Sequence, residues 1–229
     1  MNIIVNGGSR GIGREVVLFL SQDTNNQIIA TGRNKPDLES LSASSPNIHT
    51  VISDISNPDD LERSFREKIV RHFNRVDVLI NMAGALVSKE FMETDAEDAR
   101  LMMETNFFGP AGVIRIVKPL MPDGSHIVNI SSMGGFQGSM KFSGLSYYSA
   151  SKAAISCLSE CLAEEFRGSG ISVNCIALGA VQTEMLREAF PGYKAPVEAS
   201  EIASFISYFA LNCHKFMNGK VIPVAVNNP

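Results

Sequence analysis

Short runs of aliphatic and β-branched residues alternate along the whole chain with longer segments in which apolar residues recur at helical spacing. The short runs are apolar over nearly their full length, which is typical of parallel strands that are covered on both faces. This alternation predicts an α/β fold, a doubly wound parallel sheet of about seven strands with helices on both faces. The strands are expected at 3–6, 27–31, 48–52, 76–80, 126–130, 171–176 and 221–224, and the helices near 12–21, 36–42, 58–73, 95–118, 147–167 and 200–211.

Two of the expected helices begin with recognisable capping signals. Asn57 followed by Pro58 predicts an N-cap with proline in the first helical position, and residues 94–97 have the form of a capping box that starts at Thr94. No linker rich in proline, glycine or serine, no repeat and no low-complexity tract separates the elements. Residues 1–229 are therefore expected to form a single domain.

The charge balance argues against polyanionic partners. The chain has 20 lysines and arginines against 24 aspartates and glutamates, a formal net charge of −4, so neither nucleic acid nor a membrane surface is an expected partner. Its apolar runs are far shorter than the roughly 20 residues of a spanning helix, and its first residues lack the basic and apolar regions of a signal peptide. We therefore expect a cytoplasmic protein.

The cysteines and histidines form no recognisable metal or disulfide pattern. The four cysteines contain no C-x-x-C pair and the four histidines are far apart in sequence, so neither a bound metal nor a disulfide framework is expected. Cys157 and Cys161 lie one helical turn apart, and two core cysteines are the favoured interpretation over a redox pair.

A glycine-rich turn directly follows the first expected strand. Residues 6–13 read Asn-Gly-Gly-Ser-Arg-Gly-Ile-Gly, and an amphipathic helix begins immediately after them. A turn of this kind allows the backbone to approach a pyrophosphate and directs free N–H groups and the positive end of a helix dipole towards it. The alternative is a tight strand-to-helix turn without a ligand, because the spacing is G-x-x-x-G-x-G rather than the common G-x-G-x-x-G fingerprint.

A tyrosine and a lysine four residues apart are the strongest candidates for acid–base chemistry. Tyr148 and Lys152 fall in a segment whose apolar residues recur at helical spacing, so the two side chains share one helix face. The lysine charge is expected to lower the pKa of the Tyr148 phenol towards neutrality, which would make it a workable general acid or base. The adjacent Tyr147 lacks the four-residue spacing to the lysine. The alternative is an ordinary surface tyrosine and lysine.

Together, the glycine turn and the Tyr-x-x-x-Lys segment resemble the short-chain dehydrogenase/reductase family. The resemblance covers nearly the whole chain, because further landmarks of the family recur in order at Asp54, 81–84, Asn106, 131–132 and 174–183. It implies a Rossmann-type fold in one dinucleotide-binding domain that also carries the catalytic and substrate-binding residues. It also implies hydride transfer between a nicotinamide and the carbonyl or secondary alcohol of a small-molecule substrate. Relatives of this kind assemble as dimers or tetramers, so a homo-oligomer is expected.

The resemblance also implies roles for individual residues. Tyr148 would give a proton to the substrate oxygen, Ser132 would hold that oxygen, and Lys152 would also grip the nicotinamide ribose. Asn106 would complete the catalytic set. The implied coenzyme contacts are Gly7, Ser9, Arg10, Gly11, Ile12, Gly13, Arg33, Asp54, Asn81, Ala83, Gly84, Tyr148, Lys152, Val181 and Thr183.

The charges after the second expected strand favour NADP(H) over NAD(H). An NAD site typically has an acidic residue at the end of the second strand, which accepts hydrogen bonds from the ribose 2′-hydroxyl. This chain has no acidic residue after that strand before Asp37. Arg33 and Arg10 are both placed to bind a 2′-phosphate with a planar guanidinium. The alternative for Arg33 is a solvated loop arginine.

A proline four residues after Asn106 gives that position a further expected property. Pro110 has no N–H to donate, so in a continuing helix the Asn106 carbonyl loses its usual partner and is free to hold a water. The resemblance implies such a water, which would pass protons through Lys152 and the ribose to Tyr148. The alternative is that Pro110 merely kinks the helix.

Substrate identity is expected to depend on residues 133–146 and 184–199, the segments that flank the cleft. Apolar residues in the second segment, among them Met185 and Phe190, predict either a lid or a short surface helix, and a lid would favour a hydrophobic or thioester-linked substrate. Two alternatives to a general carbonyl reductase stay open. One is a reductase specific for 3-oxoacyl thioesters on an acyl-carrier protein, and the other is a non-catalytic dinucleotide-binding sensor.

Overall fold

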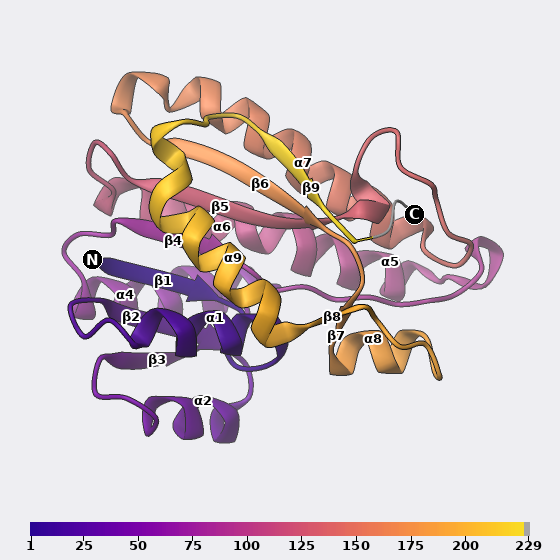
Figure 1. The fold of residues 1–229 in the computed structure, drawn as a ribbon, viewed down its shortest axis with the longest axis horizontal. Coiled ribbons are helices and arrows are strands. Elements are labelled where there is room, and N and C mark those ends of the chain that lie inside the picture. The colour runs from indigo at the N-terminus through magenta and orange to yellow at the C-terminus, as the bar shows by residue number, and fades with distance from the viewer. Residues whose placement is uncertain (227–229) are drawn as a thin grey trace.

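A computed structural model describes residues 1–226 and contains one sheet of seven strands, all paired in parallel (Figure 1). The order across the sheet is β3-β2-β1-β4-β5-β6-β9, so the chain winds outward from β1 in both directions. This arrangement confirms the predicted doubly wound α/β fold. The strands are β1 (Asn2–Asn6), β2 (Gln27–Gly32), β3 (Ile48–Ile52), β4 (Val78–Asn81), β5 (His126–Ser132), β6 (Ser172–Leu178) and β9 (Val221–Val224).

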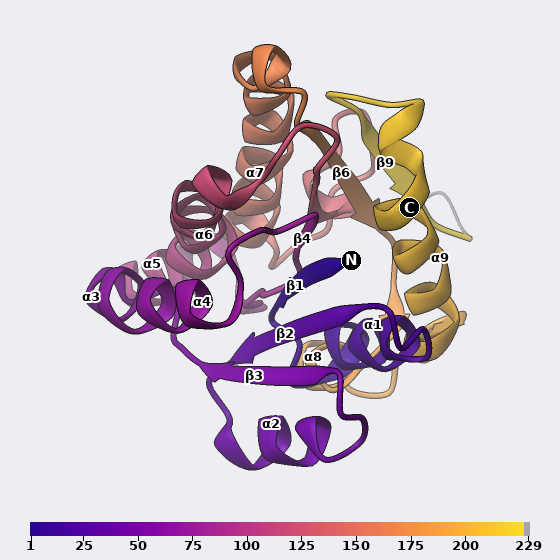
Figure 2. The same ribbon diagram turned by 90° about the vertical axis from the view of Figure 1, so that its left-hand side faces the viewer.

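The helices cover both faces of the sheet (Figure 2). Along β1, Ile3 and Val5 point into one hydrophobic core and Ile4 into the other, as the period of two in a strand requires. The first core is closed by α1 (Gly11–Ser21), α2 (Lys35–Ser42) and α9 (Ala199–Asn212). The second is closed by the turn Leu61–Phe65, α4 (Arg66–His72), α6 (Gly109–Val117) and α7 (Ser146–Glu165). Outside this core, α3 (Pro58–Asp60) leads into that turn and α5 (Ala96–Met103) packs against α7.

Two of the long predicted helices are interrupted by π-helical turns. The helix expected at 58–73 contains a π-helical turn at Leu61–Phe65, and the one expected at 95–118 contains another at Glu104–Phe108. The second turn ends just before Pro110, where the proline removes the N–H that a regular α-helix needs. A hydrophobic pattern at helical spacing does not distinguish an α-helix from one that carries a single wider turn.

The capping predictions have different outcomes. Asn57 is confirmed as an N-cap, because its side chain accepts hydrogen bonds from the backbone N–H groups of Asp59 and Asp60. The capping box starting at Thr94 is wrong. The next residue, Asp95, caps α5, whereas the Thr94 hydroxyl donates to the carbonyl of Glu90.

A short pair of strands that the sequence did not predict lies outside the main sheet. β7 (Val181–Gln182) and β8 (Val197–Glu198) pair in parallel and flank α8 (Glu184–Ala189). Two-residue strands carry too few positions to show a period. The expected strand boundaries also shift slightly, since β4 begins at Val78 rather than residue 76 and β6 continues to Leu178.

A chain of buried side-chain hydrogen bonds crosses the sheet near the carboxyl ends of its strands. The Thr31 hydroxyl donates to Asn6, Asn6 donates to Asn81, and Asn81 donates to Asn129, over distances of 2.8–3.1 Å. Asn129 in turn donates to the Ser159 hydroxyl of α7 at 2.9 Å. Since each buried amide has partners, the network ties β2, β1, β4, β5 and α7 together directly beneath the site described next.

The surface also corrects one expectation about the cysteines. Cys157 and Cys161 are exposed on α7, so the core interpretation is wrong, whereas Cys175 is buried. Among residues 1–226, no group of three or more potential metal ligands comes together. No helix in the same range is both long enough and apolar enough to span a membrane.

Candidate active site

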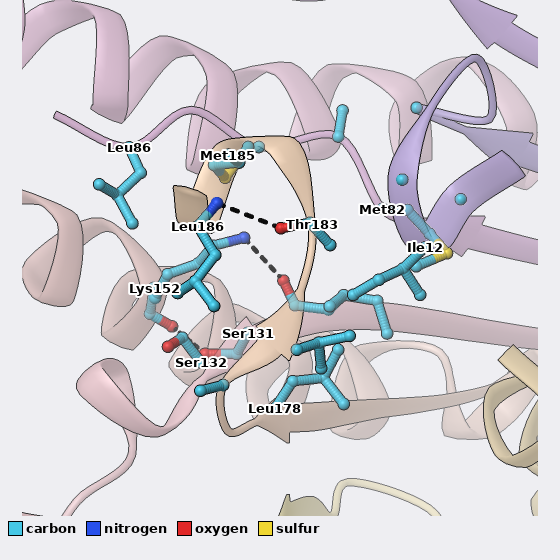
Figure 3. A pocket seen from close by; sticks show the side chains of 18 of the residues that line it. Ile12, Met82, Leu86, Ser131, Ser132, Lys152, Leu178, Thr183, Met185 and Leu186 are labelled. Carbon is cyan, nitrogen blue, oxygen red and sulfur yellow. Dashed lines mark hydrogen bonds between the residues drawn. The ribbon is translucent and has the colours of Figure 1, made fainter. Parts of the chain in front are cut away.

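A cavity of about 880 Å³ opens at the carboxyl ends of the parallel strands (Figure 3). This is the edge at which doubly wound sheets bind ligands. Its wall brings together most of the residues selected from the sequence. They are Gly7, Ser9, Arg10, Gly11, Ile12, Gly13, Arg33, Asp54, Ala83, Gly84, Ser132, Tyr148, Lys152, Val181 and Thr183.

The glycine turn between β1 and α1 is packed so closely that side chains would not fit. A Cβ on Gly13 would lie 2.1 Å from the Gly7 carbonyl oxygen, and one on Gly7 would lie 2.4 Å from the Ala83 nitrogen. Gly7 also has a φ of +85°, in the left-handed region that favours glycine. The turn therefore leaves bare backbone at the start of α1, where N–H groups and the helix dipole suit a phosphate.

Two arginines reach the cavity wall beside this turn, each near a carboxylate. Arg33 follows β2 and lies 3.6 Å from Asp54, and Arg10 lies 3.8 Å from Glu184 of α8. Burial alone would raise the pKa of Asp54, but hydrogen bonds from Ser56 and the charge of Arg33 outweigh it and lower that pKa. Asp54 is therefore ionised at neutral pH, and both arginines remain more than half exposed, open to a ligand.

Two hydroxyls on the cavity wall were missed by the sequence analysis. Ser53 and Thr105 are 3% and 8% exposed, and within the described residues neither hydroxyl oxygen has a hydrogen-bond partner. A buried polar atom without a partner is unfavourable unless a ligand or water satisfies it. Ser53 directly follows β3 and precedes Asp54, so its place at a strand end was a usable signal. With the close-packed glycine turn, these hydroxyls make the wall fit a dinucleotide.

The candidate catalytic residues converge from β5 and α7. Lys152 is buried, and its Nζ donates a hydrogen bond to the Ile130 carbonyl at 3.0 Å. The Ser131 hydroxyl donates to the Lys152 carbonyl at 2.7 Å, which fixes α7 against the strand. The Ser132 hydroxyl accepts from the backbone N–H of Gly134 at 3.2 Å. Burial lowers the pKa of Lys152 to about 8, so the ammonium is still charged at neutral pH.

The structure corrects the expected direction of the Tyr148 pKa. Burial raises the pKa of the phenol above its ordinary value, and a hydrogen bond with Ser132 offsets only part of this rise. The expectation relied on the Lys152 charge, but that ammonium is directed to the Ile130 carbonyl. The four-residue spacing placed both side chains on one helix face correctly, yet it carries no information about how far each group is removed from water. Tyr148 is therefore protonated at neutral pH.

Two asparagines selected from the sequence are buried behind the wall. Asn81 belongs to the hydrogen-bond chain across the sheet. The Asn106 side chain accepts from the backbone N–H of Ala85 at 2.8 Å and donates to its carbonyl and to the Ser151 hydroxyl, each at 2.9 Å. Asn106 lies in the π-helical turn, and its side chain ties that turn to α7 and to the segment after β4. The free carbonyl expected at this residue stays a prediction.

Within the segment 184–199, the structure confirms a short surface helix, α8, and a closing lid stays a prediction. Thr183 caps the short helix α8, since its hydroxyl accepts from the Leu186 N–H at 3.2 Å. Met185, Leu186, Phe190 and Tyr193 nevertheless all contribute to the cavity wall. The short helix and the residues after it therefore present apolar side chains to the cavity.

Comparisons with known proteins agree with this geometry. A sequence model of the family described as short chain dehydrogenase matches residues 1–194. An uncharacterized oxidoreductase of Staphylococcus epidermidis is 29% identical over 211 residues, which cover 90% of this chain and 88% of that protein. The fold is similar to a short-chain dehydrogenase/reductase from Serratia marcescens, with a TM-score of 0.86, 24% identity and coverage of 97% and 95% of the two chains. A short chain dehydrogenase from Burkholderia cenocepacia, solved in complex with NADP, has a TM-score of 0.84, 20% identity and the same coverage.

The match to the family model covers residues 1–194, which is most of the chain, and the parallel sheet and its flanking helices match those of the solved short-chain dehydrogenases. This protein belongs to the short-chain dehydrogenase/reductase family of oxidoreductases.

Proposed function

We propose that this chain is an NADP(H)-dependent oxidoreductase that transfers hydride between the nicotinamide and a carbonyl or secondary alcohol, with Tyr148 as general acid and base. One observation carries the proposal. Tyr148, Ser132 and Lys152 share one wall of a cavity whose other end is the glycine turn. The whole chain then acts as a single domain, in which one sheet edge holds both coenzyme and substrate. The bound coenzyme supplies or accepts the hydride.

The protonation states support reduction of a carbonyl. Because burial raises its pKa, the Tyr148 phenol holds its proton at neutral pH and can donate it to a substrate oxygen. Ser132, at the end of β5, holds that oxygen by a hydrogen bond. Lys152 keeps a positive charge beside the developing alkoxide, since its pKa of about 8 lies above neutral pH.

The proposed preference for NADP(H) rests on two arginines. Arg33 and Arg10 offer exposed guanidinium groups on the wall beside the glycine turn, and they suit a 2′-phosphate. The Asp54 carboxylate near Arg33 is not at the end of β2, where an NAD-binding acid is expected. The Burkholderia relative binds NADP, which supports the same choice.

We also propose a homo-oligomer as the working form. Leu101 of α5 and Phe108 of the following π-helical turn are 40% and 53% exposed, and both of these segments pack against α7. Large apolar side chains left exposed on packed helices suit an interface with a second copy of the chain. Light scattering at several protein concentrations tests the oligomer, and a monomer at all of them would contradict it.

The test of the proposed reaction is loss of NADPH absorbance with a panel of ketones, aldehydes and 3-oxoacyl thioesters. Tyr148→Phe should lower kcat by about 100- to 10,000-fold, because the phenol supplies the proton, while the affinity for NADPH stays within a few fold. Tyr147→Phe is the matched control. Its ring stacks on Phe91 with centroids 5.8 Å apart, and phenylalanine preserves that contact. Undiminished turnover in Tyr148→Phe would contradict the mechanism, and tight NADPH binding without turnover of any compound would indicate the sensor instead.

A further inference from the structure

Apart from Lys152, the charged side chains that the described part of the chain contributes to the cavity wall lie at its coenzyme end. Arg33 faces Asp54 and Arg10 faces Glu184, both beside the glycine turn. Within residues 1–226, the only other cationic side chain on the wall is Lys152, and its Nζ is directed to the Ile130 carbonyl. Every guanidinium that could hold a phosphate or carboxylate therefore lies where the coenzyme is proposed to bind.

The part of the wall around Lys152, which we call the substrate end, is otherwise apolar. Figure 3 labels Leu86, Met185 and Leu186 around the Lys152 side chain, and Phe142 and Tyr193 add aromatic rings to the same wall. Phe142 is 44% exposed and Tyr193 is 49% exposed. Large exposed apolar side chains around a cavity mark a surface that a ligand covers.

Four cationic residues belong to the segments that form this end, and two of them, Lys141 and Lys89, are held by their own neighbours, whereas Arg187 and Lys194 are exposed beside Leu186 and Tyr193. Lys141 precedes Phe142, and its Nζ donates to the Phe136 carbonyl and the Ser139 hydroxyl, each at 2.7 Å. Lys89 follows the segment that contains Leu86, and it is paired with Asp98 of α5. None of these four cationic groups lies on the cavity wall, so an anion bound there would give up water without gaining a counter-ion from these segments.

We infer that the substrate is an uncharged ketone or aldehyde, or the corresponding secondary alcohol, with an apolar group, and that the site rejects carboxylates and phosphate esters. This inference rests on the proposed function, because it identifies the substrate end by Ser132, Tyr148 and Lys152, the residues proposed to act on the substrate oxygen. The apolar group covers Phe142 and Tyr193, and the substrate oxygen meets Ser132 and Tyr148. Two effects produce this selection. The neutral compound gains apolar contacts when it binds, whereas the anion loses its hydration.

A matched pair of aryl ketones tests the inference. The methyl ester of para-acetylbenzoic acid and the free acid carry the same ketone and differ in charge at the far end of the ring. With saturating NADPH, kcat/KM for the ester should exceed that for the carboxylate by about 100-fold. Equal values for the two compounds, or a preference for the carboxylate, would overturn the inference while leaving the proposed reaction intact.

A variant that adds the missing cation sharpens the test. Leu186→Arg should raise kcat/KM for the carboxylate by about 10-fold or more relative to the ester, because the anion then has a counter-ion. Leu186→Gln is the control, since it changes shape and polarity at the same position without adding charge, and it should not raise the relative rate for the carboxylate. If both variants change the ratio of kcat/KM for carboxylate and ester equally, the wall does not select substrates by their charge.

A binding measurement separates this inference from the reaction. Calorimetric titration of Tyr148→Phe, saturated with NADP, measures the Kd of each ketone without turnover. Binding of the ester at least about 10-fold tighter than the carboxylate supports the inference even if no compound is reduced by the wild-type enzyme, in which case the proposed function alone fails. Equal affinities in this titration overturn the inference, whatever the activity shows.

Discussion

The two ends of the cavity are built by different means. At the coenzyme end the wall is mostly backbone, from the ends of β1 and β4 and the start of α1, and Gly7, Gly13 and Ala83 are in contact at distances that leave no room for a further atom. At the substrate end the wall is side chains from residues 142–145 and 185–193, and large apolar groups remain partly exposed. Close packing therefore allows the backbone of the coenzyme end only one conformation. Side chains at the substrate end can be substituted without disturbing the sheet.

The largest effect is expected from adding one methyl group to the coenzyme end. In Gly13→Ala the Cβ would lie 2.1 Å from the Gly7 carbonyl, so the turn must move. The free energy of unfolding should fall by about 3 kcal/mol or more, and NADPH affinity should fall by at least about 100-fold. Urea unfolding and titration of NADPH fluorescence measure the two changes.

Gly168→Ala is the control for that substitution. A Cβ at Gly168 meets no atom within 4 Å, and its φ lies outside the left-handed region, so both properties should stay close to wild type. An unchanged NADPH affinity in Gly13→Ala would remove the basis for calling the coenzyme end rigid.

The next effect concerns Lys152, which lies where the two ends meet. Its pKa is about 8 in the folded protein and about 10.5 in the unfolded chain, so between these values the unfolded chain binds more protons. The free energy of unfolding contributed by this group therefore rises as pH increases from about 8 to about 10.5, by up to about 3 kcal/mol. Lys152→Met should lack this rise. Urea unfolding of both proteins across that pH range measures the difference, and parallel curves would contradict the burial of a charged ammonium.

A smaller effect, confined to the coenzyme end, is expected from Arg33. Arg33→Ala should weaken NADPH binding by about 10- to 100-fold and leave NADH binding nearly unchanged, because the guanidinium is proposed to bind the 2′-phosphate. Arg66→Ala is the control, since Arg66 pairs with Glu62 on α4 and the preceding turn, away from the cavity. Dissociation constants for both coenzymes test this, and equal weakening of the two would show that Arg33 does not discriminate between them.

The same contrast explains how much the sequence could predict. Parallel strands and long helices follow from hydrophobic period, and the glycine turn and the Tyr148–Lys152 spacing are local in sequence, so all were predicted with small boundary errors. Ser53 was missed although its position after β3 could have revealed it. The two-residue strands β7 and β8 gave no period, and the pKa of Tyr148 depends on burial by segments far away in sequence. Structural features formed by residues close together in sequence were predictable. Features that depend on packing between segments far apart in sequence were not.

Tyr193 is expected to have the smallest effect on stability, while its substitution changes the KM of only one of the two reactants. Because its side chain is 49% exposed, Tyr193→Ala should change the free energy of unfolding by no more than about 0.5 kcal/mol. The KM for an apolar ketone should rise by several fold, since the ring is part of the substrate wall, while the KM for NADPH stays unchanged. Tyr208→Ala removes a tyrosine that is 62% exposed on α9 and should change neither KM. A rise in the KM for NADPH in Tyr193→Ala would mean that the two ends of the cavity are not independent, because a side chain at the apolar end would then be contributing to coenzyme binding.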